Sequence, residues 1–248
     1  MKILIIPNKT REGTAEVLSR AEEVLREEKA SWEELELIKE GDSKKAAGKS
    51  CDLVLYIGGD GTMLRAAKAA LECRAAISGI NTGNVGYRVG MKLEGWEEEL
   101  RRLISEEYET EECEVLEAEA EGKKQVCVNE AVIYSEELKE YRVYRNKEAI
   151  FESRASGIVI TTAVGSTGLN RSAGGAVLEK TLSAVEITPI CAYSKERSSL
   201  VVSSEGEYEV EFEGKAKLRC DGERSAEVKS KVKLKKREEA LSFAKAKR

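Results

Sequence analysis

The sequence predicts an α/β domain followed by a second, mainly β domain. Over the first third of the chain, apolar strand patterns alternate with helical patterns, which is typical of βαβ units and a parallel sheet. From Tyr108 onward the segments are shorter and alternate or run apolar, with turn signals such as Gly206, Gly214 and Asp221-Gly222 between them. The 248 residues suffice for one large or two modest domains. We expect the α/β domain over residues 1–95 and the β-rich domain over 96–236.

The elements of the first domain follow from apolar runs and from stretches of good helix formers. We expect strands at 2–6, 33–38, 52–57 and 75–80, and helices at 14–29, 63–71 and 94–108. A helix between successive strands favours right-handed crossovers and a parallel sheet.

The second domain is predicted from short bursts of strand pattern. These bursts cover 124–134, 141–144, 158–162, 185–190, 200–203, 208–212 and 215–219. The stretch 229–248 holds many Lys and Arg residues and is interpreted as a solvated surface rather than a nucleic-acid patch. Its last part, within 237–248, is predicted to be a helix.

The composition excludes several classes of function. Because the chain has no His, any catalytic base must be a carboxylate, Lys, Cys or Tyr, and most zinc sites are excluded. The formal net charge of −5 argues against a general nucleic-acid binder. Only four of the 46 acidic residues are Asp, and Gln occurs once. Abundant Glu and Lys with little Gln indicates a hot-growing source.

The six cysteines show no C-x-x-C pair, and most lie in apolar runs. Buried small hydrophobes are the favoured interpretation, with a disulfide left open for a hyperthermophile source. The N-terminal apolar run, residues 1–6, is too short for a signal peptide, and no segment approaches the ~20 apolar residues of a membrane span. We therefore expect a cytoplasmic protein that does not bind membranes.

One stretch organises the first domain. The apolar run 53–57 suits a buried parallel strand, and it leads directly into Gly58-Gly59-Asp60-Gly61-Thr62 and a helical segment. Ligands of open α/β sheets bind beyond the carboxyl ends of strands, where glycine turns let backbone N–H groups approach phosphate. Asp60 is therefore a candidate functional carboxylate. The alternative is a structural turn in which Asp60 caps the helix.

Three further stretches contain unusual residue patterns. A second glycine-rich loop, 79–87, follows a strand but has neither dinucleotide-fold spacing nor a P-loop. Asn129 and Glu130 place an amide and a carboxylate inside an apolar strand. They are a candidate functional pair, and the alternative is that both are surface residues at the end of the strand. The stretch 158–175 runs from an apolar strand into a series of small and hydroxylic residues, which lets a flat polar ligand approach the backbone.

Taken together, these motifs resemble the NAD kinase family, whose members use ATP or inorganic polyphosphate. The matching segments, in order, are 58–62, the loop 79–87, Asn129-Glu130, Gly165-Ser166-Thr167, Ser172-Ala173-Gly174-Gly175, Thr188-Pro189-Ile190 and Asp221-Gly222. The resemblance implies a Rossmann-like N-terminal domain, a C-terminal β-sandwich-like domain and a final helix that returns to the first domain. It also implies phosphoryl transfer to the 2′-hydroxyl on the adenosine ribose of NAD, in a homodimer or homotetramer.

The resemblance implies roles for individual residues. Asp60 is expected to act as the base or orienter for the hydroxyl, and also as a candidate ligand of a Mg²⁺ cofactor. The donor phosphates are expected at Gly58, Gly59, Gly61 and Thr62. NAD is expected at Tyr87, Asn129, Glu130, Ser156, Thr167, Gly168 and Ser172.

Two positions depart from the family pattern. Ser156 stands where the family commonly has Asp, and Leu169 stands where it commonly has Tyr, which affects the nicotinamide end of the ligand more than the adenosine end. Two other functions stay open: a lipid kinase, because such enzymes share the Gly-Gly-Asp-Gly-Thr motif, and a non-catalytic NAD(P)-binding regulator that keeps the pocket.

Overall fold

The structure is a computed structural model that describes residues 1–37, 41–82, 90–193, 198–223 and 226–247. It divides into two compact units, which are described separately. The first unit comprises Met1–Glu112 and Leu241–Arg248, and the second comprises Cys113–Ala240. The boundary therefore lies later in the chain than the expected position near residue 95, because the segment from 96 to 112 packs with the first unit.

The first unit is built on a six-stranded sheet of order β2-β1-β3-β4-β14-β5. Its strands are β1 (Lys2–Pro7), β2 (Ser31–Glu34), β3 (Leu53–Gly58), β4 (Ala76–Asn81), β5 (Tyr108–Cys113) and β14 (Leu241–Ala246). Strand β1 pairs in parallel with β2 and β3, and β4 pairs in parallel with β3 and β14. The predicted parallel α/β sheet is confirmed.

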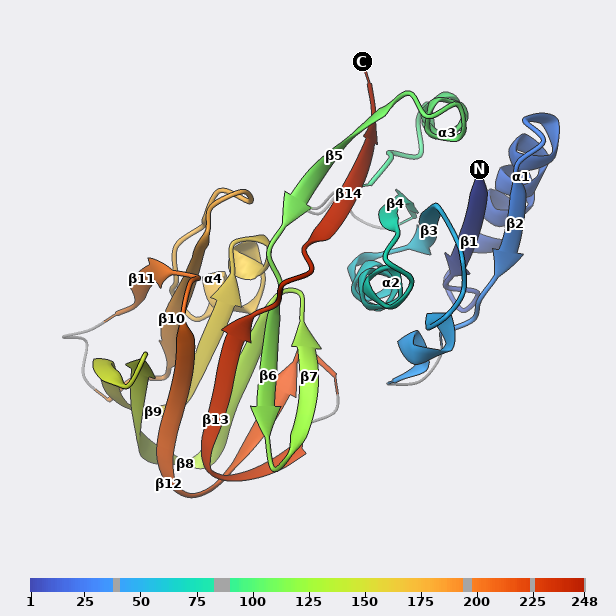
Figure 1. The fold of residues 1–248 in the computed structure, drawn as a ribbon. Coiled ribbons are helices and arrows are strands. Elements are labelled where there is room, and N and C mark those ends of the chain that lie inside the picture. The colour runs from blue at the N-terminus through green and yellow to red at the C-terminus, as the bar shows by residue number, and fades with distance from the viewer. Residues whose placement is uncertain (38–40, 83–89, 194–197, 224–225, 248) are drawn as a thin grey trace. The chain divides into compact units, whose positions relative to one another are not determined.

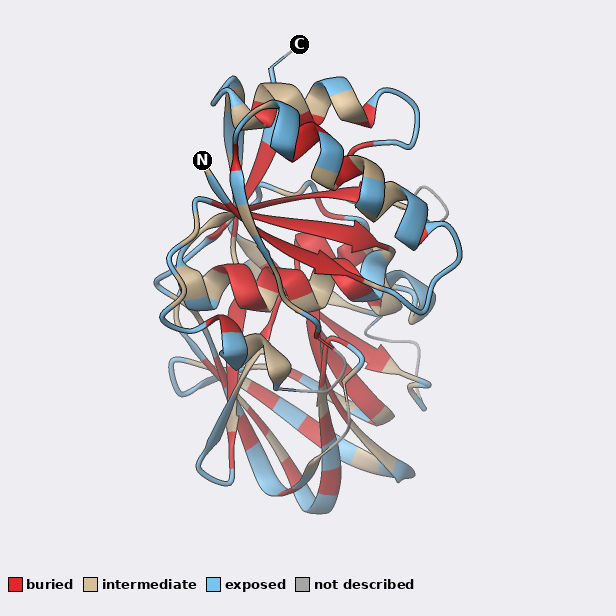
Figure 2. Ribbon diagram, turned by 90° about the vertical axis from the view of Figure 1, so that its right-hand side faces the viewer, coloured by how far each residue is buried: buried red, intermediate tan, exposed pale blue. Residues whose placement is uncertain are grey.

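Helices cover both faces of this sheet (Figures 1 and 2). Helices α1 (Thr14–Glu27) and α3 (Trp96–Ile104) pack on one face, and α2 (Asp60–Cys73) packs on the other. A short 3-10 helix, Asp42–Ala46, lies between β2 and β3. Because both faces are covered, β3 is buried along its whole length, as its continuous apolar run predicts. None of the helices in the described ranges is long and apolar enough to cross a membrane.

The second unit is an eight-stranded sheet of order β11-β10-β9-β8-β12-β13-β6-β7. All its recorded strand pairs are antiparallel. The strands are β6 (Leu116–Ala120), β7 (Lys123–Cys127), β8 (Glu130–Arg145), β9 (Glu148–Thr162), β10 (Ala184–Ile190), β11 (Leu200–Ser203), β12 (Glu207–Cys220) and β13 (Ala226–Lys236). Two short helices, a 3-10 helix (Val164–Thr167) and α4 (Leu169–Ser172), follow β9.

Alternating burial along the long strands gives this unit one continuous core. Figure 2 shows the alternation as red and pale blue bands, and β12 reads as alternately buried and less buried positions at both of its ends. Tyr141 and Tyr208 are the largest fully buried side chains of the unit. Register shifts in β8 and β12 bend these strands, because a bulge increases local twist. The mainly β second domain is thus confirmed.

Several predicted elements need correction. The segment within 237–248 is not a helix but strand β14, although it does return to the first unit as expected. The segment contains helix-favouring Glu, Lys and Ala residues, but pairing with β4 and the burial of Leu241 and Phe243, at 1% exposure, outweigh that local helix propensity. The second strand lies at Ser31–Glu34 rather than 33–38. Several of the predicted short strands are parts of the longer strands β8, β9 and β12. The strands β5, β6 and β13 were not predicted.

Candidate functional site

The turn from β3 to α2 brings two glycines to the start of a 14-residue helix. The carbonyl of Gly59 accepts hydrogen bonds from the backbone N–H groups of Thr62 and Met63, at 2.9 and 3.0 Å. A Cβ on Gly58 would lie 2.4 Å from Thr62 Oγ1, so only glycine fits there. Gly59 is the N-cap residue and Asp60 is the first helical residue, so the alternative of Asp60 as the cap is wrong.

Asp60 is exposed at the positive end of this helix. Among the described residues, no side chain or backbone group donates a hydrogen bond to its carboxylate. Gly61 beside it has open space where a Cβ would lie. The carboxylate is therefore accessible to a ligand, and unpaired helix N–H groups next to it suit an anion.

Arg11 is a further residue of this site, and sequence reasoning missed it. Arg11 lies in the loop after β1. Strands β1 and β3 are neighbours in the sheet, but the chain continues from β1 to β2 on one side and from β3 to β4 on the other. Arg11 Nη1 lies 2.9 Å from the Cβ position of Gly59, and its Nε donates to the carbonyl of Thr82 at 3.2 Å. A guanidinium therefore lies beside the glycine turn, at the switch point where α/β sheets bind ligands. The topology rule was the available signal for this residue.

In the second unit, one carboxylate organises the start of β8. Asp221 accepts hydrogen bonds from three consecutive backbone N–H groups: Val128 at 2.9 Å, Asn129 at 2.7 Å and Glu130 at 3.3 Å. In return, the backbone N–H of Asp221 donates to the carbonyl of Glu130 at 3.0 Å. Asp221 has φ 51°, a conformation that Asp tolerates better than most residues. These bonds fix the backbone of Asn129 and Glu130.

The end of β9 closes on the same segment. The carbonyl of Asn129 accepts from Thr161 Oγ1 at 3.0 Å and from the backbone N–H of Thr162 at 2.8 Å. A Cβ on Gly165 would lie 2.2 Å from that carbonyl oxygen, so this contact requires glycine. Asn129 and Glu130 are buried, at 4% and 6% exposure, rather than surface residues. The structure thus brings three of the sequence motifs together.

A buried polar network supports the loop after β9, and it was not predicted. Asn170 Nδ2 donates to Glu186 Oε2 at 2.7 Å, and Thr188 Oγ1 donates to Asn170 Oδ1 at 2.7 Å. Glu186 Oε1 accepts from the backbone N–H of Ala176 at 2.9 Å. All three side chains are fully buried. The signal was a Glu near the start of the apolar strand 185–190.

The other predicted ligand residues are placed as follows. Thr167 and Gly168 are half-buried in the loop after β9, and Ser172 is exposed at the end of α4. Ser156 lies on β9, six residues before Thr162 and therefore roughly 20 Å along the extended strand. Within one chain, Ser156 therefore lies away from Asn129 and Glu130, which are next to the Thr162 end of β9. Tyr87 lies outside the described residues.

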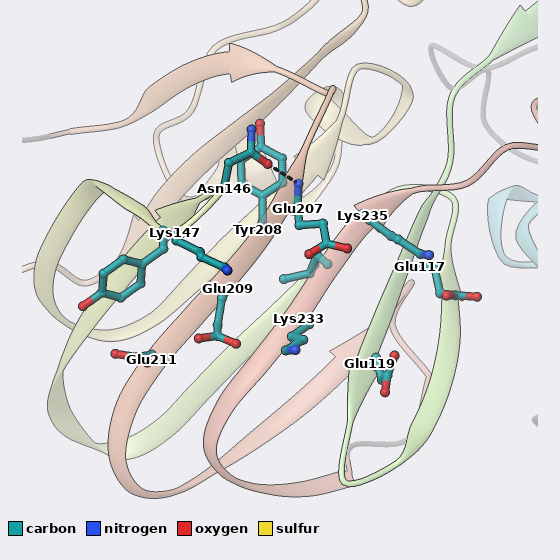
Figure 3. Close-up of a pocket in the computed structure, with 12 residues that line it drawn as sticks. Glu117, Glu119, Asn146, Lys147, Glu207, Tyr208, Glu209, Glu211, Lys233 and Lys235 are labelled. Carbon is teal, nitrogen blue, oxygen red and sulfur yellow. Dashed lines mark hydrogen bonds between the residues drawn. The ribbon is translucent and has the colours of Figure 1, made fainter.

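The second unit also has a groove of about 780 Å³ on the outer face of its sheet (Figure 3). Cross-strand neighbours explain its charges. In one row, Lys233 pairs with Glu119 on one side and Glu209 on the other; in the next, Lys235 pairs with Glu117 and Glu207. Opposite charges facing across strands stabilise a sheet surface. None of the sequence motifs lines this groove.

Fold and site together define a class: a doubly wound α/β unit with a phosphate-type glycine turn, joined to an antiparallel β unit. Residues 4–108 match the sequence model of the ATP-NAD kinase N-terminal domain, and residues 128–244 match that of the ATP-NAD kinase C-terminal domain. The chain belongs to the NAD kinase family, and the family resemblance expected from its motifs is confirmed.

Individual relatives support this assignment. The NAD kinase of Shewanella halifaxensis is 34% identical over 165 residues, covering 63% of this chain and 53% of that protein. The NAD kinase of Shewanella denitrificans is 33% identical over 189 residues, covering 73% and 61%. The chain thus spans about half to three-fifths of these relatives.

Solved structures share the whole fold. An NAD kinase from Archaeoglobus fulgidus in complex with ATP superimposes with a TM-score of 0.83 at 25% identity, covering 100% of this chain and 94% of that one. Yeast NADH kinase complexed with NADH gives a TM-score of 0.84 at 16% identity, covering 100% and 84%. The latter similarity shows the fold alone.

Proposed function

We propose that this protein transfers a phosphoryl group from ATP or polyphosphate to the 2′-hydroxyl on the adenosine ribose of NAD, giving NADP. The observation that carries this proposal is Asp60, an exposed carboxylate at the first residue of α2 in a chain of the NAD kinase family. Phosphoryl transfer proceeds through a loose transition state, so it needs positioning and charge neutralisation more than covalent chemistry.

The first unit supplies the groups for the donor. The unpaired N–H groups at the start of α2, together with Gly58, Gly59, Gly61 and Thr62, would bind the donor phosphates. The Arg11 guanidinium beside Gly59 would add a positive charge suited to phosphate. Asp60 would accept or orient the proton of the acceptor hydroxyl, a role that contributes roughly 10²–10⁴-fold to the rate.

The site also fits a magnesium ion. Among the described residues no cluster of three or more His, Cys, Asp or Glu side chains forms a complete metal site. Mg²⁺ is commonly held by one or two carboxylates together with substrate phosphates, so the accessible Asp60 carboxylate matches that requirement. When bound, Mg²⁺ supplies neutralisation of the triphosphate charge.

The second unit supplies the groups for NAD. Asn129 and Glu130, whose backbone is fixed by Asp221, would hydrogen-bond ribose hydroxyls or the adenine edge. Thr167, Gly168 and Ser172 would contribute a small, polar surface from the loop that the Asn170–Glu186 pair supports.

Three further expectations accompany this function. We propose a cytoplasmic protein that binds neither nucleic acid nor membranes, assembles as a homodimer or homotetramer, and comes from a hot-growing source. The Glu- and Lys-rich composition supports the last of these. Light scattering of the purified protein would measure the assembly, and thermal unfolding would measure the heat resistance.

Incubation of the full chain with NAD, ATP and Mg²⁺, scored for NADP with an NADP-specific dehydrogenase, tests the proposal. NADP formation that depends on all three additions is the expected result. Phosphorylation of a diacylglycerol or sphingosine substrate in place of NAD would indicate a lipid kinase instead. Binding of NAD or NADP without turnover would indicate a non-catalytic regulator.

A further inference from the structure

Two cysteines lie at the open end of the strand–turn–helix segment that carries Asp60. Cys51 lies two residues before the first residue of β3, and Cys73 is the last residue of α2. The chain runs along β3 to the glycine turn and returns along α2, so its two ends meet. The Cys51 thiol donates a hydrogen bond to Cys73 Sγ at 3.3 Å, across 22 positions of the sequence.

The first cysteine pair is less buried than the other close pair of the chain's described residues. The two side chains are half-buried rather than enclosed. The contrast is with Cys127 and Cys220, whose sulfur atoms lie 2.7 Å apart but whose side chains are fully buried in the core of the second unit. An approaching thiol or disulfide therefore has access to the first pair and not to the second.

We propose that Cys51 and Cys73 are a redox modification site at which a reversible intrachain disulfide closes the Asp60-bearing segment into a covalent ring. The contact distance requires only a small approach to reach the ~2.05 Å of a sulfur–sulfur bond. This inference does not depend on the proposed kinase activity.

The two thiols have different roles in forming the bond. The hydrogen bond from Cys51 lowers the pKa of Cys73 below its ordinary value, whereas the pKa of Cys51 is raised by that same bond and by burial. Cys73 is therefore the attacking thiolate, since the thiolate is the nucleophile in disulfide exchange.

The oxidant is a low-molecular-weight disulfide. The Cys73 thiolate attacks one sulfur atom of the reagent, and the reagent's sulfur–sulfur bond breaks. One reagent thiolate departs, and the other half of the reagent stays on Cys73 as a mixed disulfide. The Cys51 thiol then releases its proton to solvent, its sulfur attacks Cys73 Sγ, and the second reagent thiolate leaves. Two protein thiols are oxidised by two electrons, and one reagent disulfide is reduced to two thiols.

The disulfide would raise stability by restricting the unfolded chain, and this effect is measurable. The reduced full-length protein is incubated with oxidised glutathione, remaining thiols are alkylated, and tryptic peptides are mapped by mass spectrometry. We expect the peptide of residues 50–65 to be linked to that of residues 69–74. The oxidised form should unfold about 5–10 °C above the form kept in reduced glutathione.

Variants separate the site from its neighbours. Cys51→Ser and Cys73→Ser should each abolish both the cross-link and the rise in Tm, and Cys51→Ser should leave a glutathione adduct on Cys73. Cys191→Ser, which removes an exposed cysteine, should change neither. The proposal is overturned if no link between the two peptides forms, if Cys127 and Cys220 are linked in its place, or if the rise in Tm persists in Cys51→Ser.

Discussion

The carboxylate of Asp221 accepts a hydrogen bond from the backbone N–H of Asn129 at 2.7 Å, across 92 positions of the sequence. The same carboxylate holds Val128 and Glu130, so one side chain sets the backbone conformation of the whole Asn129-Glu130 motif. The Asp-Gly near the end of the chain and the Asn-Glu in its middle therefore form one structural device, with Asp221 in a positioning role.

Asp221→Asn should weaken these hydrogen bonds, because the amide NH₂ group would replace one carboxylate oxygen and would then face a backbone N–H group, which is also a donor. Loss of one such buried hydrogen bond costs about 1–3 kcal/mol. We expect a lower Tm and a KM for NAD raised about tenfold, with the KM for ATP little changed. Asp52→Asn is the matched control, since Asp52 also accepts a backbone hydrogen bond, from Lys2, but at an exposed position. Equal effects of the two variants would contradict the positioning role.

Asp60→Asn keeps size and hydrogen-bonding capacity but removes the charge. Turnover should fall by about 10²-fold or more, while the affinity for NAD changes much less. Initial rates at saturating NAD, ATP and Mg²⁺ measure this. Asp42→Asn is the control, because Asp42 also follows a glycine N-cap at the start of a helix. Near-normal turnover of Asp60→Asn would show that the carboxylate only stabilises the helix start.

Arg11→Ala should raise the KM for ATP about tenfold or more, because hydrogen bonds to charged groups contribute about 1.5–3 kcal/mol. Arg11→Lys should give an intermediate value, since Lys keeps the charge but loses the planar fork. Lys9→Ala, in the same loop but paired with Glu34, is the control and should leave the KM for ATP unchanged. If Arg11→Ala raises the KM for NAD alone, the guanidinium belongs to the acceptor and not to the donor.

Asn129→Ala removes a buried amide from the proposed NAD site and should raise the KM for NAD by about tenfold, leaving that for ATP nearly unchanged. Asn146→Ala is the control, because this exposed amide accepts a hydrogen bond from the backbone N–H of Glu207 and lies on the hairpin between β8 and β9. The reverse pattern, with the KM for ATP raised, would assign Asn129 to the donor.

Ser156→Asp restores the acid that the family commonly has at this position. The family resemblance alone puts this position near the nicotinamide ring. A negative charge there would favour the cationic NAD⁺, so the ratio of kcat/KM for NAD⁺ to that for NADH should rise above the parent's. Ser153→Asp, on the same strand and also half-buried, should leave the ratio unchanged. An unchanged ratio in Ser156→Asp would show that this position does not contact the nicotinamide, in keeping with its distance along β9 from Thr162, which bonds Asn129.

Parts of the candidate site could be predicted because their signals are local. An apolar run followed by Gly58-Gly59 and a helix-forming segment specifies a strand, a turn and a helix within 20 residues or so, and Asp60 follows from it. The burial of Asn129 and Glu130 had no such local signal in the sequence. It depends on Asp221, Thr161 and Gly165, which approach from other strands.

The sequence by itself determined the parallel α/β unit, the β-rich unit, the family and the position of Asp60 in a glycine turn between a strand and a helix, since each rests on periodicity or on contiguous motifs. Only the tertiary structure decided that residues 241–246 form a strand, that Arg11 lies beside Gly59, and that Glu186 is buried against Asn170. The physical reason is that these outcomes depend on partners distant in sequence. Strand pairing and burial contribute more free energy than local propensity does, and no local pattern encodes which partners will meet.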